Sequence, residues 1–419
     1  MGMRIPALLW FAVLGALAWP LPAGGQPPRE SCVACHLEID DDRLAAPARN
    51  FQEDIHATKG FGCVACHGGD PKAPGMEAMD PNKGYIGVPV GQKVVQVCGR
   101  CHSDARFMRQ YNPAMRVDQV VEYRSSVHGQ RLFDLGDPQV ATCSSCHKPH
   151  MIRPASDPRS TVHPLKVADT CGTCHADAKY MKAYGIPTDQ FEKYRQSVHW
   201  KAMSVKGDLS APTCNDCHGN HGAAPPGVSW VGNVCGQCHA VVADLFDKSA
   251  HSQVFVLLGT PGCATCHNHH DITAATVEML GLGEQAVCAR CHSADDPGGE
   301  TATTMREQIE GLWGKYREVH ALLQKAEHAG MEVSQAQFEL NEAMGALVKA
   351  RTAVHTFDVE PVEKETEAGL AIAAKALDRA VQALEELQFR RKGLAVSVVI
   401  ILALIGGLVA KIRQLDRQA

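Results

Sequence analysis

The five-residue pattern C-x-x-C-H occurs nine times in this chain, and it limits what the chain can fold into more than any other feature. Two thiols three residues apart can bond the two vinyl groups along one haem edge, and the adjacent histidine can then reach the iron as its proximal ligand. All 18 cysteines belong to these copies, so none remains for a disulfide or a free thiol. The sequence therefore predicts nine covalently attached c-type haems.

A single C-x-x-C pair could also be half of a zinc site or a redox dithiol. Nine repetitions, each followed by histidine, exclude both interpretations for the set. The predicted attachment residues are Cys32, Cys35, Cys63, Cys66, Cys98, Cys101, Cys143, Cys146, Cys171, Cys174, Cys214, Cys217, Cys235, Cys238, Cys263, Cys266, Cys288 and Cys291. The predicted proximal iron ligands are His36, His67, His102, His147, His175, His218, His239, His267 and His292.

The composition agrees with an interior filled by haem. Hydrophobic residues make up 45% of the chain but Phe, Trp and Tyr only 5%, so porphyrin rings would supply core that aromatic side chains do not. The formal net charge of -5 argues against nucleic acid as a partner.

The N-terminus has the features of a secretory signal. A short basic start ending in Arg4 precedes an apolar run over residues 5–21, and small residues follow at Ala23, Gly24 and Gly25. A core helix is the alternative. Export agrees with the cysteine pattern, because c-type haem is attached on the outer side of the energy-conserving membrane.

A second apolar run, over residues 393–410, contains no charged residue. At about 1.5 Å per residue it reaches roughly 27 Å, enough to cross the hydrocarbon core of a bilayer. Basic residues flank both ends, so flanking charge does not set the orientation, but the haem motifs must lie outside. We therefore expect a single-pass protein on the periplasmic side of the inner membrane, with a cytoplasmic C-terminus. A buried helix of a soluble protein is the alternative.

The chain contains an internal repeat. The segment VCGRCHSDARFMRQY at 97–111 is echoed by TCGTCHADAKYMKAY at 170–184, and YRSSVH ending at His128 is echoed by YRQSVH ending at His199. Each copy then has a second motif with an extra histidine three residues after the proximal one, at His150 and His221.

A shorter third copy contains His251 and His270, and a degenerate first copy contains His56 but lacks the extra histidine after its motif at Cys63. A half copy starts at Cys288 and ends in YREVH, at His320. The haem motifs thus form four pairs plus one.

This repeat predicts the distal iron ligands. A histidine three residues after the proximal one lies on the same face of a short helix, so it cannot reach the far side of its own haem and must serve a neighbouring haem. The upstream histidines supply five more ligands, and His355 is assigned by elimination to the remaining haem, at Cys63. The predicted distal ligands are His56, His128, His150, His199, His221, His251, His270, His320 and His355.

Residues 301–392 lack cysteine and are rich in Ala, Glu, Leu, Gln and Lys. Apolar residues recur at spacings of three and four, which predicts amphipathic helices. Gly330 indicates a break, a second helix is expected over 334–355, and Pro361 is expected in the first turn of a third, which would continue into the apolar run. These helices would form a stalk, or could pair with another subunit.

We therefore expect a mainly α fold with much irregular coil: a multihaem cytochrome c core, long C-terminal helices and one transmembrane helix. The expected segments are a signal peptide at 1–25, a nine-haem domain at 26–300, a helical stalk at 301–392, a transmembrane helix at 393–411 and a tail at 412–419.

From Ser31 to Ser293 the motifs resemble the multihaem cytochromes grouped with cytochrome c3 and the doubled C-x-x-C-H domains. The long helices after the last motif are similar in plan to those of pentahaem nitrite reductase and octahaem hydroxylamine oxidoreductase. The catalytic lysine of many nitrite reductase motifs is absent here, and no tyrosine cross-link signature can be read.

The leading hypothesis is an electron carrier in which nine bis-histidine haems pass electrons between a membrane quinol-oxidising partner and a periplasmic or extracellular acceptor. The rival hypothesis is a reductase of a small nitrogen or sulfur oxide with one open iron position. The haem at Cys63 motivates the rival, because its distal ligand is assigned only by elimination.

Overall fold

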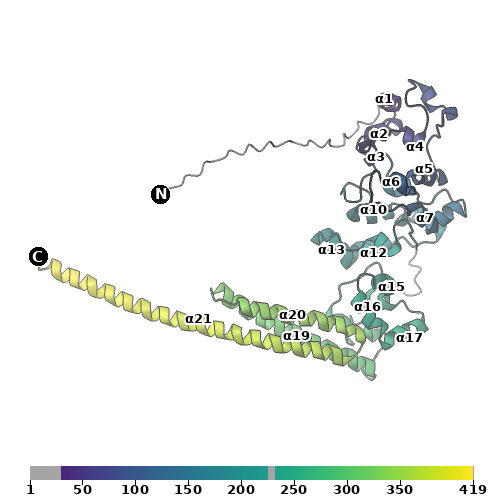
Figure 1. Cartoon of the computed structure of the whole chain (residues 1–419). Coiled ribbons are helices and arrows are strands. Elements are labelled where there is room, and N and C mark those ends of the chain that lie inside the picture. The colour runs from purple at the N-terminus through teal and green to yellow at the C-terminus, as the bar shows by residue number, and fades with distance from the viewer. Residues whose placement is uncertain (1–29, 225–231, 419) are drawn as a thin grey trace, which may run out of the picture. The chain divides into compact units, whose positions relative to one another are not determined.

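The computed structural model describes residues 30–224 and 232–418 (Figure 1). The predicted signal peptide falls outside these residues. The described chain is mainly helical and contains no strand, which confirms the predicted fold class. It divides into two units, one with residues 30–191 and 202–224 and the other with residues 192–201 and 232–418.

The first unit is built from short helices joined by irregular segments. Two of the helices, α12 and α13, contain residues of both units. The elements up to the internal gap are α1 (Ser31–Glu38), α2 (Asp42–Phe51), α3 (Ile55–Thr58), α4 (Val64–His67), η1 (Met76–Met79), η2 (Pro81–Lys83), α5 (Gln92–His102), α6 (Ala105–Met108), α7 (Gln119–Ser125), α8 (Val127–Phe133), α9 (Cys143–His147), α10 (Pro164–His175), α11 (Ala178–Met181), η3 (Lys182–Tyr184), α12 (Gln190–Gln196), α13 (Val198–Lys206) and α14 (Cys214–His218).

The second unit carries the last three motifs and the long helices. Its further elements are α15 (Gly232–Cys235), α16 (Ala240–Asp247), α17 (Ala250–Leu258), α18 (Gly262–His267), η4 (Val277–Met279), η5 (Cys288–Arg290), α19 (Pro297–His328), α20 (Ser334–Ala353), η6 (Val354–Thr356) and α21 (Val359–Asp416).

Most attachment motifs form a helical turn, which places the two cysteines on one side of the turn. In several copies the helix ends at the proximal histidine: α9 ends at His147, α14 at His218 and α18 at His267. Lys148 follows with φ 42° and Asn268 with φ 61°, so the chain leaves the helix in the left-handed region. The premise that the offset histidine lies on the same helix was therefore wrong, because the helix stops before reaching it.

The three long helices pack together as the periodicity predicted. Leu312 of α19, Leu347 of α20 and Val362 of α21 are buried in one cluster, and Val319 and Leu323 of α19 in a second. Ala376 and Ala380 of α21 complete the second cluster. Figure 1 shows α20 and α21 side by side in green and yellow.

The helix α19 ends just before Gly330, whose φ of 80° suits glycine. The helix α21 then runs for 58 residues without a break, past the end of the predicted stalk. An 18-residue apolar window of α21 buries none of its residues, and the helix is long and apolar enough to cross a membrane.

Candidate haem-binding sites

Seven motif histidines each face a second histidine across a gap of nearly constant width. The imidazole centroids of these pairs are 6.0–6.3 Å apart. The pairs are His102 with His56, His67 with His150, His175 with His128, His147 with His221, His239 with His199, His292 with His251 and His267 with His355.

This separation fits one metal ion between two imidazoles. A metal–imidazole nitrogen bond is about 2 Å long and the ring centre lies about 1 Å beyond the nitrogen, so two rings on opposite sides of one iron would have centroids roughly 6 Å apart. His269 and His270, which pack directly, have centroids only 4.8 Å apart. The paired residues therefore fit a haem iron held from both faces.

The structure brings together seven of the nine predicted distal histidines with motif histidines, in a regular register. The offset His150 belongs to the fourth motif and faces His67 of the second, and His221 of the sixth faces His147 of the fourth. Both of these offset histidines thus face the motif two places earlier.

The upstream histidines have the opposite register. His56 lies between the first and second motifs and faces His102 of the third, and His251 lies between the seventh and eighth and faces His292 of the ninth. The same holds for His128 and His199, so these four upstream histidines face a motif further along the chain.

The structure differs from two of the predicted assignments, that of His355, made by elimination, and that of His320, made from the half copy of the repeat. His355 faces His267 and not the haem site at Cys63, where His150 faces His67. His320 is exposed in the middle of α19, where its ring stacks on Tyr316 with centroids 5.9 Å apart. No described motif histidine is placed opposite His320.

The four upstream histidines that face a motif histidine are each the second residue of a helix, directly after the N-cap and first residue. Asp54 caps α3 by accepting the His56 N–H at 2.9 Å, and the Ser126 hydroxyl caps α8 by accepting the Gly129 N–H at 2.9 Å. Ser197 and Ser249 hold the same position before His199 and His251. The repeated Ser-Val-His segment is therefore the beginning of a helix, and the N-cap fixes the position of one imidazole.

The upstream and offset segments are joined by a backbone hydrogen bond that recurs in each repeat. Ile55 N–H donates to Ile152 O at 2.8 Å and Val127 N–H to Ala223 O at 3.0 Å. The third copy has Val198 N–H donating to Ile272 O at 2.9 Å. Each acceptor lies two residues after an offset histidine, so His270 holds the position in its repeat that His150 and His221 hold in theirs.

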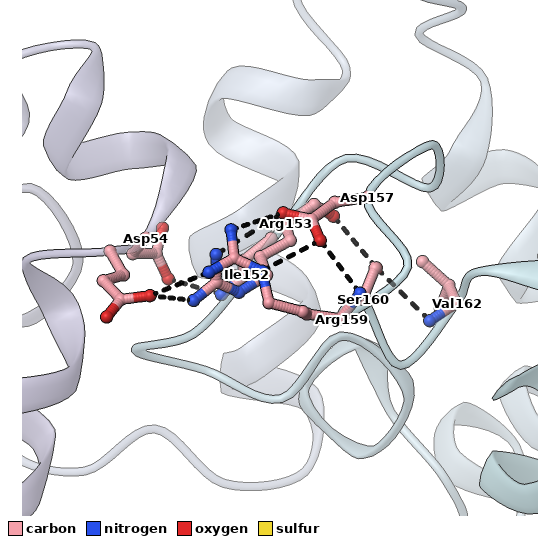
Figure 2. Close-up of polar contacts among 8 residues, drawn as sticks. Asp54, Ile152, Arg153, Asp157, Arg159, Ser160 and Val162 are labelled. Carbon is pink, nitrogen blue, oxygen red and sulfur yellow. Dashed lines mark hydrogen bonds and ion pairs between the residues drawn. The ribbon is translucent and has the colours of Figure 1, made fainter.

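The first of these junctions is reinforced by a buried carboxylate (Figure 2). Asp54 accepts the Ile152 N–H at 2.7 Å and also contacts His56 Nδ1 at 2.9 Å. Burial raises the pKa of Asp54, but the hydrogen bonds from His56 and Ile152 outweigh it and lower that pKa, so the side chain is an anion. Asp54 therefore links the segment of His56 to the segment of His150.

A partly buried ion-pair cluster lies beside this junction (Figure 2). Arg153 pairs with Glu53 and lies 3.4 Å from Asp157, and Arg159 lies 2.9 Å from Asp157. Together with Thr58 and nearby residues these side chains line an open hollow of about 300 Å³. The cluster holds the loop after His150 against the start of α3.

The Nδ1 atoms of several histidines are bound to protein oxygens. Those of His36, His67 and His218 lie 3.1, 2.9 and 3.0 Å from the carbonyl oxygens of Leu44, Gly87 and Ala224. A carbonyl can only accept, so each ring donates its Nδ1–H and carries its lone pair on Nε2. Such outer bonds orient metal-ligating histidines.

Burial also keeps the imidazoles in the form that binds metal. It lowers the pKa of His102, His128, His147 and His175, with neighbouring histidines lowering it further. The neutral ring is the ligand, because metal and proton compete for the same lone pair.

Consecutive motifs lie close together at their cysteines. The side chains of Cys98 and Cys143 are near enough for each to change the pKa of the other. The same holds for Cys171 with Cys214 and for Cys235 with Cys263. Pairs close enough to interact electrostatically are Cys32 with Cys63, Cys66 with Cys101, Cys146 with Cys174, and Cys266 with Cys288 and Cys291. Within each unit, motif order in the sequence is therefore motif order in space.

Residues 234–312 match the family model described as cytochrome c554 and c-prime. The match covers the last three motifs and the start of α19, and it supports a c-type cytochrome with covalently attached haem c. A search of curated proteins finds no significant match. A search of solved structures finds none either.

Proposed function

We propose that this c-type cytochrome carries nine haems as one relay, and that α21 anchors it to the membrane. The relay would pass electrons between a quinol-oxidising partner in the membrane and an acceptor in the periplasm or outside the cell. The observation that carries the proposal is the proximity of the cysteines of consecutive motifs.

This proximity sets the spacing of the attachment points. Each cysteine would bond one edge of its haem, so cysteines that lie close together bring the edges of successive haems close together. The first six motifs form one such series in the first unit, and the last three form another in the second unit. A short edge-to-edge gap at every step is what electron hopping requires.

The paired histidines suit a carrier. An imidazole on each face would saturate the iron, and when bound the haem supplies reversible one-electron chemistry at low potential. The protein's part is to hold both rings, keep them neutral and shield them from water. In this proposal His267 pairs with His355, His67 pairs with His150, His270 remains a distal ligand, and His320 has no ligand role.

The position of the apolar part of α21 in the chain supports a periplasmic location for the haem units. The apolar part of α21 follows the last haem motif, and c-type haem attachment on the outer side would leave the residues after 411 in the cytoplasm. Redox partners would then meet the haem units on the periplasmic face. Pairing of the long helices with another subunit stays a prediction.

The test uses the purified full-length chain. Mass spectrometry should give nine covalently bound haems, and a potentiometric titration should reduce all of them reversibly at low potential. Protein in membrane vesicles should be reduced by a quinol only when a quinol-oxidising partner is present. Fewer than nine haems, or a block of haems that never exchanges electrons with the rest, would contradict a nine-haem relay.

A further inference from the structure

Two of the paired histidines have a carboxylate behind the ring. His56 Nδ1 lies 2.9 Å from Asp54 Oδ1, and His292 Nδ1 lies 2.9 Å from Asp296 Oδ1. His56 is the histidine opposite His102 of the third motif, and His292 belongs to the ninth motif. One ligand of the third haem and one ligand of the ninth haem would therefore be bound to a carboxylate on the side away from the iron.

Both carboxylates are held as anions. The side chain of Asp54 is only 1% exposed, and it also accepts the Ile152 N–H at 2.7 Å. Asp296 precedes the 32-residue helix α19 and accepts the N–H groups of Gly298 and Gly299 at 2.9 and 3.0 Å, where the helix dipole favours a negative charge. An ionised carboxylate can only accept, so both rings donate their Nδ1–H.

The preceding motif in each unit has a ligand that is bound to a neutral carbonyl instead. His67 of the second motif has its Nδ1 2.9 Å from the Gly87 carbonyl oxygen. His355, which faces His267 of the eighth motif, has its Nδ1 3.0 Å from the Thr352 carbonyl oxygen. A carboxylate makes the imidazole a stronger electron donor than a carbonyl does, which stabilises ferric relative to ferrous iron. Neighbouring haems should therefore differ in reduction potential.

An arginine adds to this difference at both junctions. Arg100 is the third residue of the third motif and donates to the Ala65 carbonyl of the second motif at 3.1 Å. Arg290 has the same place in the ninth motif and donates to the Thr265 carbonyl of the eighth at 2.9 Å. A positive charge beside a haem favours its reduced form, because reduction removes a positive charge from the iron. Each guanidinium therefore places positive charge at the motif that has the carbonyl-bound ligand.

We propose that Asp54 and Asp296 hold the third and ninth haems at lower reduction potentials than the second and eighth haems, and that Arg100 and Arg290 add to the step. This inference rests on the proposed relay. In each unit, one electron then passes energetically downhill from ferrous iron at the third or ninth site to ferric iron at the second or eighth site, and no bond forms or breaks. Because Asp54 is buried and the side chain of Asp296 is 35% exposed, the contribution of the carboxylate is larger in the first unit.

A potentiometric titration followed by low-temperature EPR tests this on the purified full-length protein with all haems attached. The low-spin signal lost in His56→Ala identifies the third haem, and the one lost in His251→Ala identifies the ninth. Asp54→Asn should raise the potential of the third haem and shift its electron equilibrium with the second about tenfold, or about 59 mV. Asp296→Asn should raise the potential of the ninth haem by less. Asp134→Asn, at an exposed carboxylate, should change neither potential.

The arginine variants test the sign of the effect from the other side of each junction. Arg100→Gln should lower the potential of the second haem, and Arg290→Gln that of the eighth. Arg100→Lys keeps the charge and should leave the potential of the second haem close to that of the wild type. An equal fall in Arg100→Lys and Arg100→Gln would overturn the part of the inference that concerns charge.

Other outcomes separate the two proposals. Nine haems whose potentials stay unchanged or fall in both aspartate variants would overturn the inference and leave the relay intact. If Asp54→Asn converts the third haem to high spin, Asp296→Asn decides, because asparagine also caps the beginning of a helix. Fewer than nine haems in the wild type would instead contradict the relay.

Discussion

The distal histidines are set by the residue two positions before them. Ser126 precedes His128 and Ser197 precedes His199, and each serine accepts a backbone hydrogen bond in the first turn of its helix. In YREVH the same position is Glu318, in the middle of α19, so His320 has no helix start to aim it. The segment YREVH resembles YRSSVH in sequence, but it lacks the serine N-cap that begins a helix before His128. The assignment of His320 as a distal ligand did not take this cap into account.

Replacing His128 by alanine should leave nine haems attached and convert one from low to high spin. The imidazole faces His175 with centroids 6.1 Å apart, and no other described histidine is placed to replace it. Low-temperature EPR should show about one ninth of the low-spin signal lost. The matched control is His320→Ala, which should leave the spectrum unchanged; an unaltered spectrum in both variants would remove His128 from the ligand set.

Replacing Asp54 by asparagine should disturb two haems at once. The carboxylate accepts from Ile152 N–H and contacts His56 Nδ1, so the change weakens charge-assisted bonds to the segments of two distal ligands. We expect a loss of about 1–3 kcal/mol in the free energy of unfolding. The EPR signals of the haems at His102 and His67 should broaden together.

The exposed Asp134 offers a control for this change. Asp134→Asn should leave both stability and spectrum unaltered. If Asp54→Asn broadened the signal of only one haem, Asp54 would not link the two segments.

At the scale of elements, the long helices were predictable and the short ones were not. The spacings of four and three between Leu312, Tyr316, Val319 and Leu323 are a local pattern, and in the fold these residues belong to the hydrophobic clusters. The haem units depend on pairings between segments about a hundred residues apart, such as Ile55 with Ile152, which no local pattern encodes. Which motif each distal histidine serves could therefore not be read from spacing.

Gly369 lies where α21 packs tightly against Leu312 of α19 and Ala346 of α20. A Cβ there would lie 2.7 Å from Leu312 and 3.0 Å from Ala346, so a larger side chain must force the helices apart. Gly369→Leu should destabilise the bundle by about 1–3 kcal/mol. Hydrogen exchange should rise in peptides from α19, α20 and α21.

Gly345 of α20 is the matched control, because a Cβ there would meet nothing within 4 Å. Gly345→Ala should be neutral or stabilise α20 by up to about 1 kcal/mol, since alanine favours the helix. Equal hydrogen exchange in the Gly369→Leu variant and the wild type would mean that the helices are not tightly packed at this point.

For the whole molecule, the pairing of histidines differs from the grouping that the sequence suggested. The sequence suggested four pairs of haem motifs followed by a single one at Cys288, yet His251 is placed opposite His292 of that last motif. Counting motifs could not show this, because the pairing runs across consecutive repeats.

Removing the apolar C-terminal part of α21 should leave the two haem-binding units folded. Buried contacts of α21 with the other long helices end with Ala380 and the half-buried Leu384 and Leu387, whereas the apolar window beyond them buries nothing. Ending the chain after Lys392 should therefore move almost all of the protein from the membrane fraction to the soluble periplasmic fraction. All nine haems should remain attached, and the unfolding free energy should change by less than about 0.5 kcal/mol.

A second truncation tests the reason for this outcome. Ending the chain after Asp358 also removes Val362, Ala376 and the other buried residues of α21, so it should expose the apolar faces of α19 and α20 and prevent stable folding of the second unit. Because η6 carries His355, loosening of that segment should also convert the haem at His267 to high spin. If the chain that ends after Lys392 stayed in the membrane fraction after a salt wash, a partner or another segment would hold the protein there. In that case α21 would be a stalk without an anchoring role.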